Sequence, residues 1–354
     1  MSLLKRTLEK IYPQDSDSRD AAKERLDQLA LPPWALGDLM DLGVALAGMT
    51  RSMQPPVGRK AVVTMAGDHG VVAEGVSKFP QEVTPQMVYN FVNGGAGINA
   101  LARQAGADVV VVDMGVAADL NDLAEQGKII NKKVGLGTDN IAQGPAMSQA
   151  MAMRAVESGI DVAMDLGERV DLFGTGDMGI GNTTPSTAIA AVITGKPVEE
   201  LTGRGTGLDD EQLQHKQEVI KKILACNAPD PKNGLDILAK VGGFEIGGIA
   251  GLIIGAAAQR KPVLVDGFIS SAGALIAIAI EPFVRDYIIC SHRSMEPGHR
   301  AMQEKIGCKP LLDLNMRLGE GTGAALAMNL VEAAVAVLTE VATFEEAAVA
   351  GADK

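Results

Sequence analysis

The sequence predicts an α/β protein with a doubly wound, mostly parallel sheet and a small helical subdomain built from both ends of the chain. Short apolar runs rich in β-branched residues recur along the middle of the chain, and most of them lead through glycines into a helical pattern. Strands that are apolar without alternation are typical of a sheet covered on both faces. Their alternation with helices favours right-handed βαβ units.

Five strands follow from these runs. In chain order, the stretches are KAVVTMAGDHG (60–70), DVVVVDMG (108–115), RVDLFGTGDMGIGNTT (169–184), KPVLVDGFISS (261–271) and DYIICSHRS (286–294). Two longer apolar runs, 246–258 and 267–280, fall short of the roughly 20 residues that span a bilayer and predict buried helices. We therefore expect a Rossmann-like sheet whose ligands bind at the carboxyl ends of the strands.

The two ends of the chain lack strand signals and predict helices. Residues 18–48 and 328–349 place apolar residues at helical spacing, the second stretch with acids on the opposite face. We predict a large substrate-binding α/β domain over 46–304 and a small helical subdomain made of 1–45 and 305–354.

The composition argues against several classes of protein. A net charge of −12, from 32 basic and 44 acidic residues, and only 3% aromatic residues argue against a nucleic-acid surface. Cys226, Cys290 and Cys308 are odd in number and lack CxxC spacing, so they predict neither a disulfide framework nor, with four scattered histidines, a zinc site. The charged N-terminus does not match a secretory signal. We expect a cytoplasmic protein without a membrane span.

A glycine-rich stretch, GTGDMGIGNTTPSTA (174–188), separates the third predicted strand from a helix that begins near Asn182. Such a turn can aim backbone N–H groups and a helix dipole at an anion. The GxGxxGxG order matches neither the Walker A pattern nor a dinucleotide fingerprint. From these residues alone, a plain strand-to-helix turn and a phosphate site stay open.

A second glycine loop, TGRGTG (202–207), precedes a helix that carries Lys216. A lysine on a helix is usually solvated, but one placed shortly after a glycine loop can reach a phosphate. Asp68 and His69 follow the first strand. A structural role, in which Asp68 caps the loop, is a simpler interpretation than a metal site. Ser291 and His292 are adjacent in an extended segment, so we predict that they point apart and form no catalytic couple.

One carboxylate, Glu320, lies between Gly319 and Gly321 in the stretch MRLGEGTGAALAMNLVEAA (316–334), just ahead of an apolar helix. A solubilising surface charge seldom needs glycines on both sides. A base approached closely by a flat substrate does. From this stretch alone, a solubilising charge and a catalytic carboxylate stay open.

Together these stretches resemble the nicotinate-nucleotide–dimethylbenzimidazole phosphoribosyltransferase family of cobalamin biosynthesis. The resemblance covers nearly the whole chain. The matching segments are LPPWALGDLMDLGVALAG (31–48), AGDHGVVAEGVS (66–77), NIAQGPAMS (140–148), LFGTGDMGIGNTTPS (172–186), KVGGFEIGGIAG (240–251), PVLVDGFISSAGAL (262–275) and MRLGEGTGAALAMNLVEAA (316–334).

The resemblance implies a reaction with two small-molecule substrates, no metal and no cofactor. Nicotinate mononucleotide gives its phosphoribosyl group to dimethylbenzimidazole, which yields nicotinate and α-ribazole 5′-phosphate with inversion at the anomeric carbon. The carboxylate of the RLGEG loop, here Glu320, is implied to be the general base. The family also implies a homodimer.

Further site residues follow from the same resemblance. Asp177 is implied to support catalysis. The phosphate and ribose positions match Gly176, Gly179, Asn182, Thr183, Gly205, Lys216 and Ser291, and the base pocket matches Phe79, Met87, Leu318 and Gly319.

This chain departs from the family pattern at two places. Asp177 stands where other members carry a glutamate, so its carboxylate is one methylene shorter. Phe79 and Met87 stand where some members have Ser and Gln, which predicts a more apolar pocket and a different choice among benzimidazoles, purines and phenolics.

Two other classes of protein fit the sequence less well than the transferase. A non-catalytic nucleotide-binding protein would gain little from burying the unpaired charge of Glu320 beside an apolar heterocycle. A dinucleotide-dependent oxidoreductase would need GxGxxG spacing and an acid after the second strand, and the sequence has neither. The sequence therefore favours the transferase.

Overall fold

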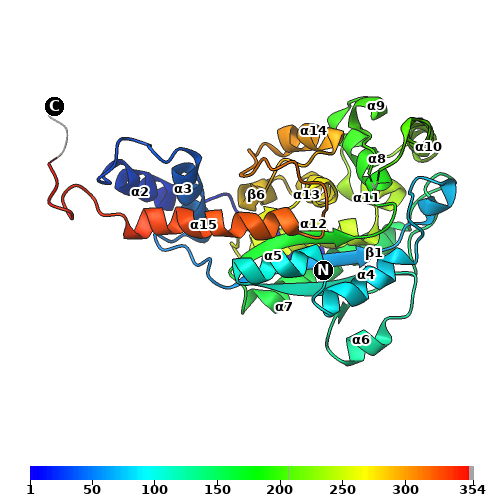
Figure 1. The fold of residues 1–354 in the computed structure, drawn as a ribbon, viewed down its shortest axis with the longest axis horizontal. Helices are drawn as coiled ribbons and strands as arrows, with labels where there is room; N and C mark the ends of the chain where they lie inside the picture. The colour runs from blue at the N-terminus through cyan, green and yellow to red at the C-terminus, as the bar shows by residue number, and fades with distance from the viewer. Residues whose placement is uncertain (206, 351–354) are drawn as a thin grey trace.

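The computed structural model describes residues 1–205 and 207–350. Its centre is a six-stranded parallel sheet in the order β3-β2-β1-β4-β5-β6, so the predicted doubly wound α/β fold is confirmed (Figure 1). The strands are β1 (Lys60–Gly67), β2 (Ala107–Gly115), β3 (Ile130–Asn131), β4 (Leu172–Met178), β5 (Val263–Val265) and β6 (Ile288–Cys290). The chain starts in the middle of the sheet, winds outward to β3 and returns to build the other half, as in dinucleotide-binding folds.

All five predicted strands are present, and the sequence missed only β3 among the strands of the described residues. This strand has two residues, which pair with Val112 and Asp113 of β2. Two residues are too few to show a period, so no sequence pattern could reveal β3.

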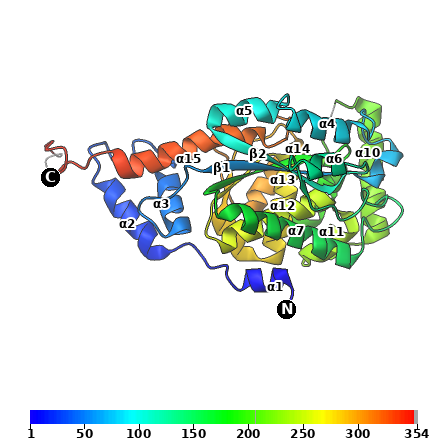
Figure 2. The same cartoon turned by 90° about the horizontal axis from the view of Figure 1, so that it is seen from below.

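Helices cover both faces of the sheet, which explains why all eight residues of β1 are buried. On one face lie α4 (Val83–Val92), α5 (Gly97–Ala105) and α15 (Thr322–Glu340) (Figure 2). On the other lie α7 (Gln149–Gly167), α12 (Phe244–Ala258) and α13 (Phe268–Ile280). The two apolar runs are thus the buried helices α12 and α13, as predicted.

The remaining helices and turns of the sheet domain connect these elements. They are α6 (Asn121–Glu125), α8 (Thr183–Thr194), α9 (Val198–Leu201), α10 (Asp210–Asn227), α11 (Gly234–Val241), α14 (Pro297–Ile306) and the 3₁₀ turns η1 (Gly70–Glu74) and η2 (Pro282–Tyr287).

Helices α7 and α12 pack closely, and glycines make the close approach possible. A Cβ atom added to Gly159 would overlap the carbonyl oxygen of Gly248, and one added to Gly251 would overlap that of Val156. The two backbones therefore touch, and only glycine fits at these positions.

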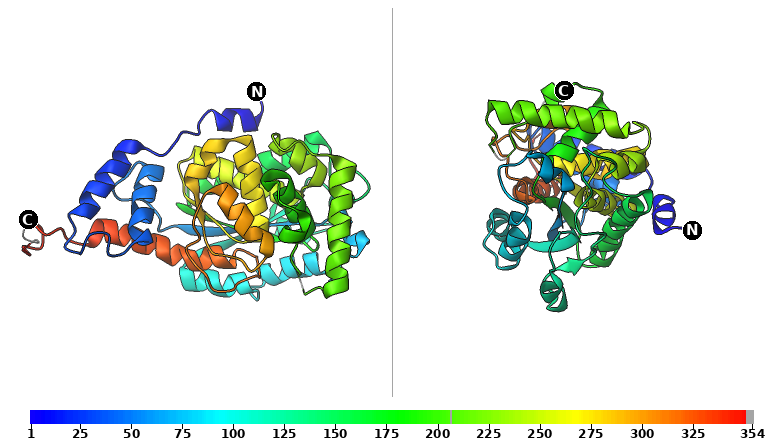
Figure 3. Two further views of the ribbon diagram at one scale, coloured as in Figure 1. Left: turned by 90° about the horizontal axis from the view of Figure 1, so that it is seen from above. Right: turned by 90° about the vertical axis from the view of Figure 1, so that its right-hand side faces the viewer.

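The two ends of the chain build a second, smaller hydrophobic cluster beside the sheet domain. Its buried residues come from α2 (Ser16–Asp27), α3 (Asp38–Thr50) and the end of α15, and include Leu26, Met40 and Leu338. Figure 3 shows this group apart from the sheet. Two pieces of the proposed subdomain lie elsewhere, because α1 (Leu3–Leu8) packs on α7 and α12 and the first half of α15 packs on the sheet. The two-domain division therefore stays a proposal.

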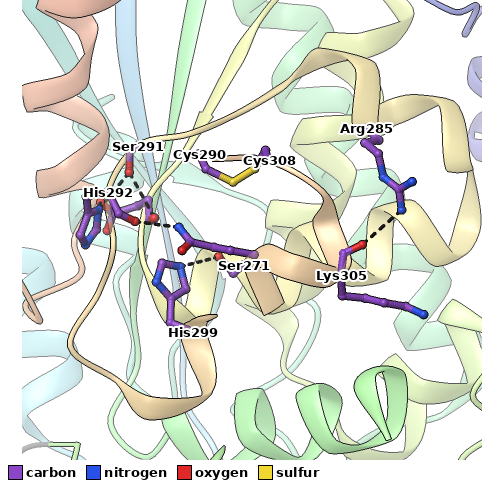
Figure 4. Close-up of a disulfide and its surroundings, with 10 residues drawn as sticks. Ser271, Arg285, Cys290, Ser291, His292, His299, Lys305 and Cys308 are labelled. Atoms are coloured by element: carbon purple, nitrogen blue, oxygen red, sulfur yellow. Dashed lines mark hydrogen bonds and ion pairs between the residues drawn. A yellow bond between two sulfur atoms is a disulfide. The ribbon is translucent and has the colours of Figure 1, made fainter. Parts of the chain in front are cut away.

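Cys290 and Cys308 form a disulfide, which the sequence prediction had excluded (Figure 4). Their Cα atoms are 5.9 Å apart although 18 residues separate them in the chain. The prediction was wrong because the pairing is made by the fold, which brings the end of β6 beside the segment after α14. The third cysteine, Cys226, is free and exposed.

Among the described helices, α15 is long and apolar enough to cross a membrane by length and composition. Half of its most apolar window is buried inside the protein. Packing against α3, α5 and the sheet accounts for this apolar character.

Candidate active site

A cavity of about 460 Å³ opens at the carboxyl edge of the sheet, where β4, β5 and β6 end. In a doubly wound sheet, this edge is where ligands bind. The lining residues come from the ends of these strands and the segments that follow them, from the second glycine loop, from the segment before α15 and from the segment between η1 and α4. They are Phe79, Asp177, Asn182, Thr183, Gly205, Gly267, Phe268, Ile269, His292, Ser294, Glu296, Arg317, Leu318 and Gly319.

The end of β4 brings a carboxylate to the cavity, and the loop after it brings a helix N-terminus. Asp177 is buried; its Oδ2 accepts a hydrogen bond of 3.1 Å from Nδ2 of Asn182, and its Oδ1 has no partner among the described atoms. Burial raises the pKa of Asp177 well above its usual range, and the nearby carboxylates of Asp266 and Glu245 raise it further. Asp177 is therefore a carboxyl group that holds a proton readily.

The glycines of this loop serve close backbone contacts. A Cβ atom at Gly176 would overlap the carbonyl oxygen of Glu320, and one at Gly179 would overlap that of Gly67. Neither glycine is among the residues that line the cavity. Gly176 thus lets β4 approach the segment that carries Glu320, and Gly179 lets the loop after β4 approach the end of β1.

Lys216, on α10, is buried beside the cavity. Its Nζ donates a hydrogen bond of 2.7 Å to Oγ1 of Thr183, and a Cβ atom at Gly205 would lie 3.5 Å from this nitrogen. Burial lowers the pKa of Lys216 to about 8, while the carboxylate of Glu296 opposes this shift. The two glycine loops and the lysine thus meet at one end of the cavity, as an anion site requires.

Glu320 lies in a turn of three residues with left-handed backbone. The φ angles are +85° at Gly319, +64° at Glu320 and +98° at Gly321. The glycines adopt this conformation without strain, whereas a glutamate does so only when its surroundings hold it there. The carbonyl oxygen of Glu320 accepts a hydrogen bond from Oγ1 of Thr64 at 3.1 Å.

The side chain of Glu320 points toward the N-terminus of α5. Its Oε2 accepts a hydrogen bond of 2.9 Å from the backbone N–H of Ile98. Burial is the main cause that raises the pKa of Glu320, and the negative charge of Asp266 adds to it. The carboxylate is therefore more basic than a solvated glutamate.

Besides Gly176, Gly179 and Lys216, three predicted site residues do not line the cavity. Met87 is half-buried on α4 and packs against the main core, whereas Phe79 and Leu318 line the cavity and are 47% and 61% exposed. Ser291 is fully buried, and its Oγ donates to the carbonyl oxygen of Asp266 at 3.2 Å. Glu320 is next to a lining residue but does not itself line the cavity.

Two expectations about strand-end residues have different outcomes. Asp68 is the structural cap that was predicted, because its Oδ2 accepts a hydrogen bond of 2.7 Å from the N–H of Ala117. The prediction that Ser291 and His292 point apart was wrong, because Oγ of Ser291 lies 3.0 Å from Nδ1 of His292. Irregular backbone after β6 lets the histidine ring fold back toward the serine (Figure 4).

Sequence reasoning missed several residues that line the cavity, among them Glu296 and Arg317. It also did not predict that His292 lines the cavity. An acid or a histidine directly after an apolar strand was the available signal for Asp266 and His292. For Glu296 and Arg317 no local pattern exists, because the fold alone brings their loops together. Within the described part of the chain, no three His, Cys, Asp or Glu side chains converge as metal ligands do.

Comparison with known proteins identifies the family. A sequence model described as "Phosphoribosyltransferase" matches residues 11–349. A nicotinate-nucleotide–dimethylbenzimidazole phosphoribosyltransferase of Desulfotalea psychrophila is 70% identical over 355 residues and covers 100% of both chains. The chain belongs to this phosphoribosyltransferase family. A second relative of the same name, from Syntrophotalea carbinolica, is 59% identical and covers 99% of both chains.

A solved phosphoribosyltransferase has the same architecture. The crystal structure of the Thermus thermophilus enzyme named for nicotinate nucleotide and dimethylbenzimidazole is 44% identical to this chain, with a TM-score of 0.90. The match covers 96% of this chain and 100% of that one. The protein is thus an enzyme, a pentosyltransferase of the phosphoribosyltransferase family.

Proposed function

We propose that this phosphoribosyltransferase moves the phosphoribosyl group of nicotinate mononucleotide to 5,6-dimethylbenzimidazole, with inversion at the anomeric carbon. The names of its relatives support the substrates. The observation that carries the proposal is the meeting of two segments at one cavity. The glycine loops with Lys216 supply an anion site, and the left-handed turn supplies a carboxylate of raised pKa close by.

Glu320 acts as the general base in this proposal. Nicotinate on the ribose is a cationic pyridinium and leaves as a neutral ring without an acid. The incoming benzimidazole must lose its ring N–H as its other nitrogen bonds to the sugar carbon, and a positioned carboxylate accepts that proton. Attack from the face opposite to the leaving nicotinate gives the inverted product.

The remaining site residues have supporting roles in the proposal. Asn182, Thr183, Gly205 and Lys216 hold the phosphate, where Lys216 supplies the charge and the first turn of α8 supplies N–H groups. Gly176 and Gly179 shape the phosphate side of the cavity, and Ser291 supports the ribose. Phe79, Met87, Leu318 and Gly319 form the base side, and Asp177 assists Glu320.

Replacement of Glu320 by Gln tests the base. The reaction of nicotinate mononucleotide with dimethylbenzimidazole is followed by chromatography of nicotinate and ribazole phosphate. We expect the wild type to form both products and Glu320→Gln to lose about 10²–10⁴ in kcat, because general-base catalysis is worth that much. Activity should rise with pH through the raised pKa of Glu320 and then level off, because only the ionised carboxylate accepts a proton.

The matched control is Glu340→Gln, which removes a carboxylate from the exposed far end of α15, the helix that follows Glu320. It should keep wild-type kcat. Equal activity of Glu320→Gln and the wild type would contradict the base assignment and point to Asp177. Absence of product with dimethylbenzimidazole, adenine and a phenol would support a nucleotide-binding protein instead.

The preferred acceptor base is a separate part of the proposal. The exposed apolar side chains of Phe79 and Leu318 at the cavity favour a planar methylated heterocycle. Competition between dimethylbenzimidazole, adenine and phenol in one mixture ranks the acceptors directly. A preference for adenine or phenol would reject this part while leaving the transferase in place.

We also propose a homodimer in the cytoplasm, as the resemblance implies. Light scattering coupled to size exclusion measures the oligomeric state. Thiols stay reduced in the cytoplasm, so this location entails that Cys290 and Cys308 are thiols in the cell and pair on oxidation. Alkylation during lysis in denaturant, which exposes the buried Cys290, followed by mass spectrometry, should then label all three cysteines; labelling of Cys226 alone would contradict the location.

A further inference from the structure

Asp266, directly after β5, holds the segment that carries Glu320. It is 1% exposed, and its carboxylate accepts three hydrogen bonds from backbone N–H groups at the start of α15. Oδ2 accepts from Gly321 at 3.2 Å, and Oδ1 accepts from Gly323 at 2.7 Å and from Ala324 at 3.1 Å. Since Gly321 at the N-cap has no side chain, the cap of α15 comes from a residue 55 positions earlier.

This arrangement matches the electrostatics of a helix start. The first turn of a helix leaves N–H groups without partners and carries a partial positive charge, so a carboxylate stabilises it. Gly321 is also the last residue of the left-handed turn. The carboxylate of Asp266 therefore binds both the turn and the first residues of the helix. Glu320 is thereby fixed between Asp266 on one side and the Ile98 N–H on the other.

Asp266 is itself fixed by both neighbouring strands. Its N–H donates to Oγ1 of Thr175 in β4 at 3.1 Å, and its carbonyl oxygen accepts from Oγ of Ser291 after β6 at 3.2 Å. Nδ1 of His292 lies 3.7 Å from Oδ1. The position of the carboxylate is therefore set by the rigid sheet rather than by a loop.

We propose that Asp266 is the positioning residue of the catalytic base: its buried carboxylate transmits the geometry of the sheet to the left-handed turn and holds Glu320 at the cavity. The proposal rests on the base role proposed for Glu320. A second consequence follows from charge. Because Asp266 is negative and close, it contributes to the raised pKa of Glu320 and so to the basicity of the carboxylate.

The charged groups around this pair come from three elements. Asp177 faces both carboxylates from β4, His292 faces Asp266 from the segment after β6, and Glu245 on α12 acts on Asp177. On the side of α5, Glu320 meets backbone N–H groups. Loss of the Asp266 charge should thus lower the pKa of Glu320.

Asp266→Asn tests the proposal, because asparagine keeps the size and one acceptor oxygen but removes the charge. We expect kcat to fall about tenfold or more while the KM for nicotinate mononucleotide stays within about twofold, since the phosphate side is untouched. The ascending limb of the pH profile should shift to lower pH. A purely structural role would not move that limb.

The matched control is Asp113→Asn. Asp113 is also a buried carboxylate that accepts a backbone hydrogen bond, from Val116 at 2.9 Å, but it belongs to β2, two strands away from β4. This variant should lose stability without a shift of the pH profile. An Asp266→Asn enzyme with the kcat and the pH profile of Asp113→Asn would overturn the proposal.

Thr175→Val and the comparison with Glu320→Gln distinguish the possible outcomes. If Asp266→Asn does not fold, Thr175→Val weakens the hold on Asp266 while keeping its charge; kcat should fall severalfold with KM unchanged, and wild-type kinetics would overturn the proposal. If the wild type is active, Glu320→Gln is impaired and Asp266→Asn is normal, only the positioning role fails. If Glu320→Gln is as active as the wild type, the proposed base role fails first.

Discussion

Buried carboxylates gather at the carboxyl edge of the sheet, and His69 and His292 each lie beside one of them. Asp177, Asp266 and Glu320 are each less than a tenth exposed, and Glu245 pairs with His69 at 2.8 Å. Burial raises the pKa of Asp177, Asp266 and Glu320. These buried carboxylates are therefore more basic than solvated ones, and their burial lowers the stability of the folded protein, as is common at enzyme sites.

Asp177 should reveal this trade-off through the pH dependence of stability. Its pKa is higher in the folded protein than in the unfolded chain, so its contribution is fully present at low pH and is lost as pH rises through the folded pKa. Asp177→Asn cannot ionise and escapes that loss. We expect the free energy of unfolding of the variant, relative to the wild type, to increase with pH.

Urea unfolding at a series of pH values measures this difference, provided that the m-value is unchanged. The exposed Asp20 on α2 offers the control Asp20→Asn, which should show little pH-dependent gain. A constant difference between Asp177→Asn and the wild type across the series would contradict the prediction.

At the residue scale, the sequence predicted those candidate site residues that a local pattern marks. The glycine loops, Lys216 and Glu320 were visible because glycines flank or precede them. The cap that Asp266 makes and the contact of Ser291 with His292 were not visible, because they depend on how β5, β6 and α15 meet. Distant pairings of this kind leave no spacing in the chain.

At the scale of elements, the glycine contacts between α7 and α12 should be intolerant of any side chain. A Cβ atom at Gly251 would overlap the carbonyl oxygen of Val156 and lie 2.9 Å from the nitrogen of Ile160, and both atoms are backbone. We expect Gly251→Ala to lower the free energy of unfolding by about 3 kcal/mol or more, because the helices must separate. Urea unfolding measures the loss.

Gly144 provides the comparison for this substitution. No described atom lies within 4 Å of a Cβ atom added there, so Gly144→Ala should be neutral or stabilise by up to about 1 kcal/mol. Equal effects of the two substitutions would show that the contact between α7 and α12 is more pliable than its geometry indicates.

The elements that the sequence predicted are those with long or strongly apolar patterns. β1 and β2 and the helices α12 and α13 were found because each is continuous and buried. The two-residue β3 and the bond between Cys290 and Cys308 were missed, because the first has no period and the second is a product of tertiary structure.

At the scale of the whole molecule, α15 joins the active site to the second hydrophobic cluster. Its 19 residues span about 28 Å, from the turn with Glu320 to Leu338, which is fully buried between α2 and α3. Figure 1 shows this helix crossing from the sheet to the group formed by the chain ends. The two cores are thus linked by one rigid element.

Leu338→Ala tests how strongly the cores are linked. We expect it to lower the free energy of unfolding by about 2–5 kcal/mol, because it leaves a cavity in the second cluster. Since the sheet and Asp266 hold the other end of α15, kcat at temperatures below unfolding should stay within about twofold of the wild type. Leu136→Ala, at a 71% exposed position, should change neither quantity. A large fall of kcat would show that the second cluster steers the base.

The order of the site residues along the chain matters during synthesis. All six strands of the described residues, both glycine loops and Lys216 lie before residue 295, whereas Glu320 and α15 come later. A ribosome makes the chain from the N-terminus, so the proposed phosphate side of the cavity leaves the ribosome before the proposed base does. At that stage the nascent chain carries the proposed anion site without the carboxylate that is proposed to act on the substrate.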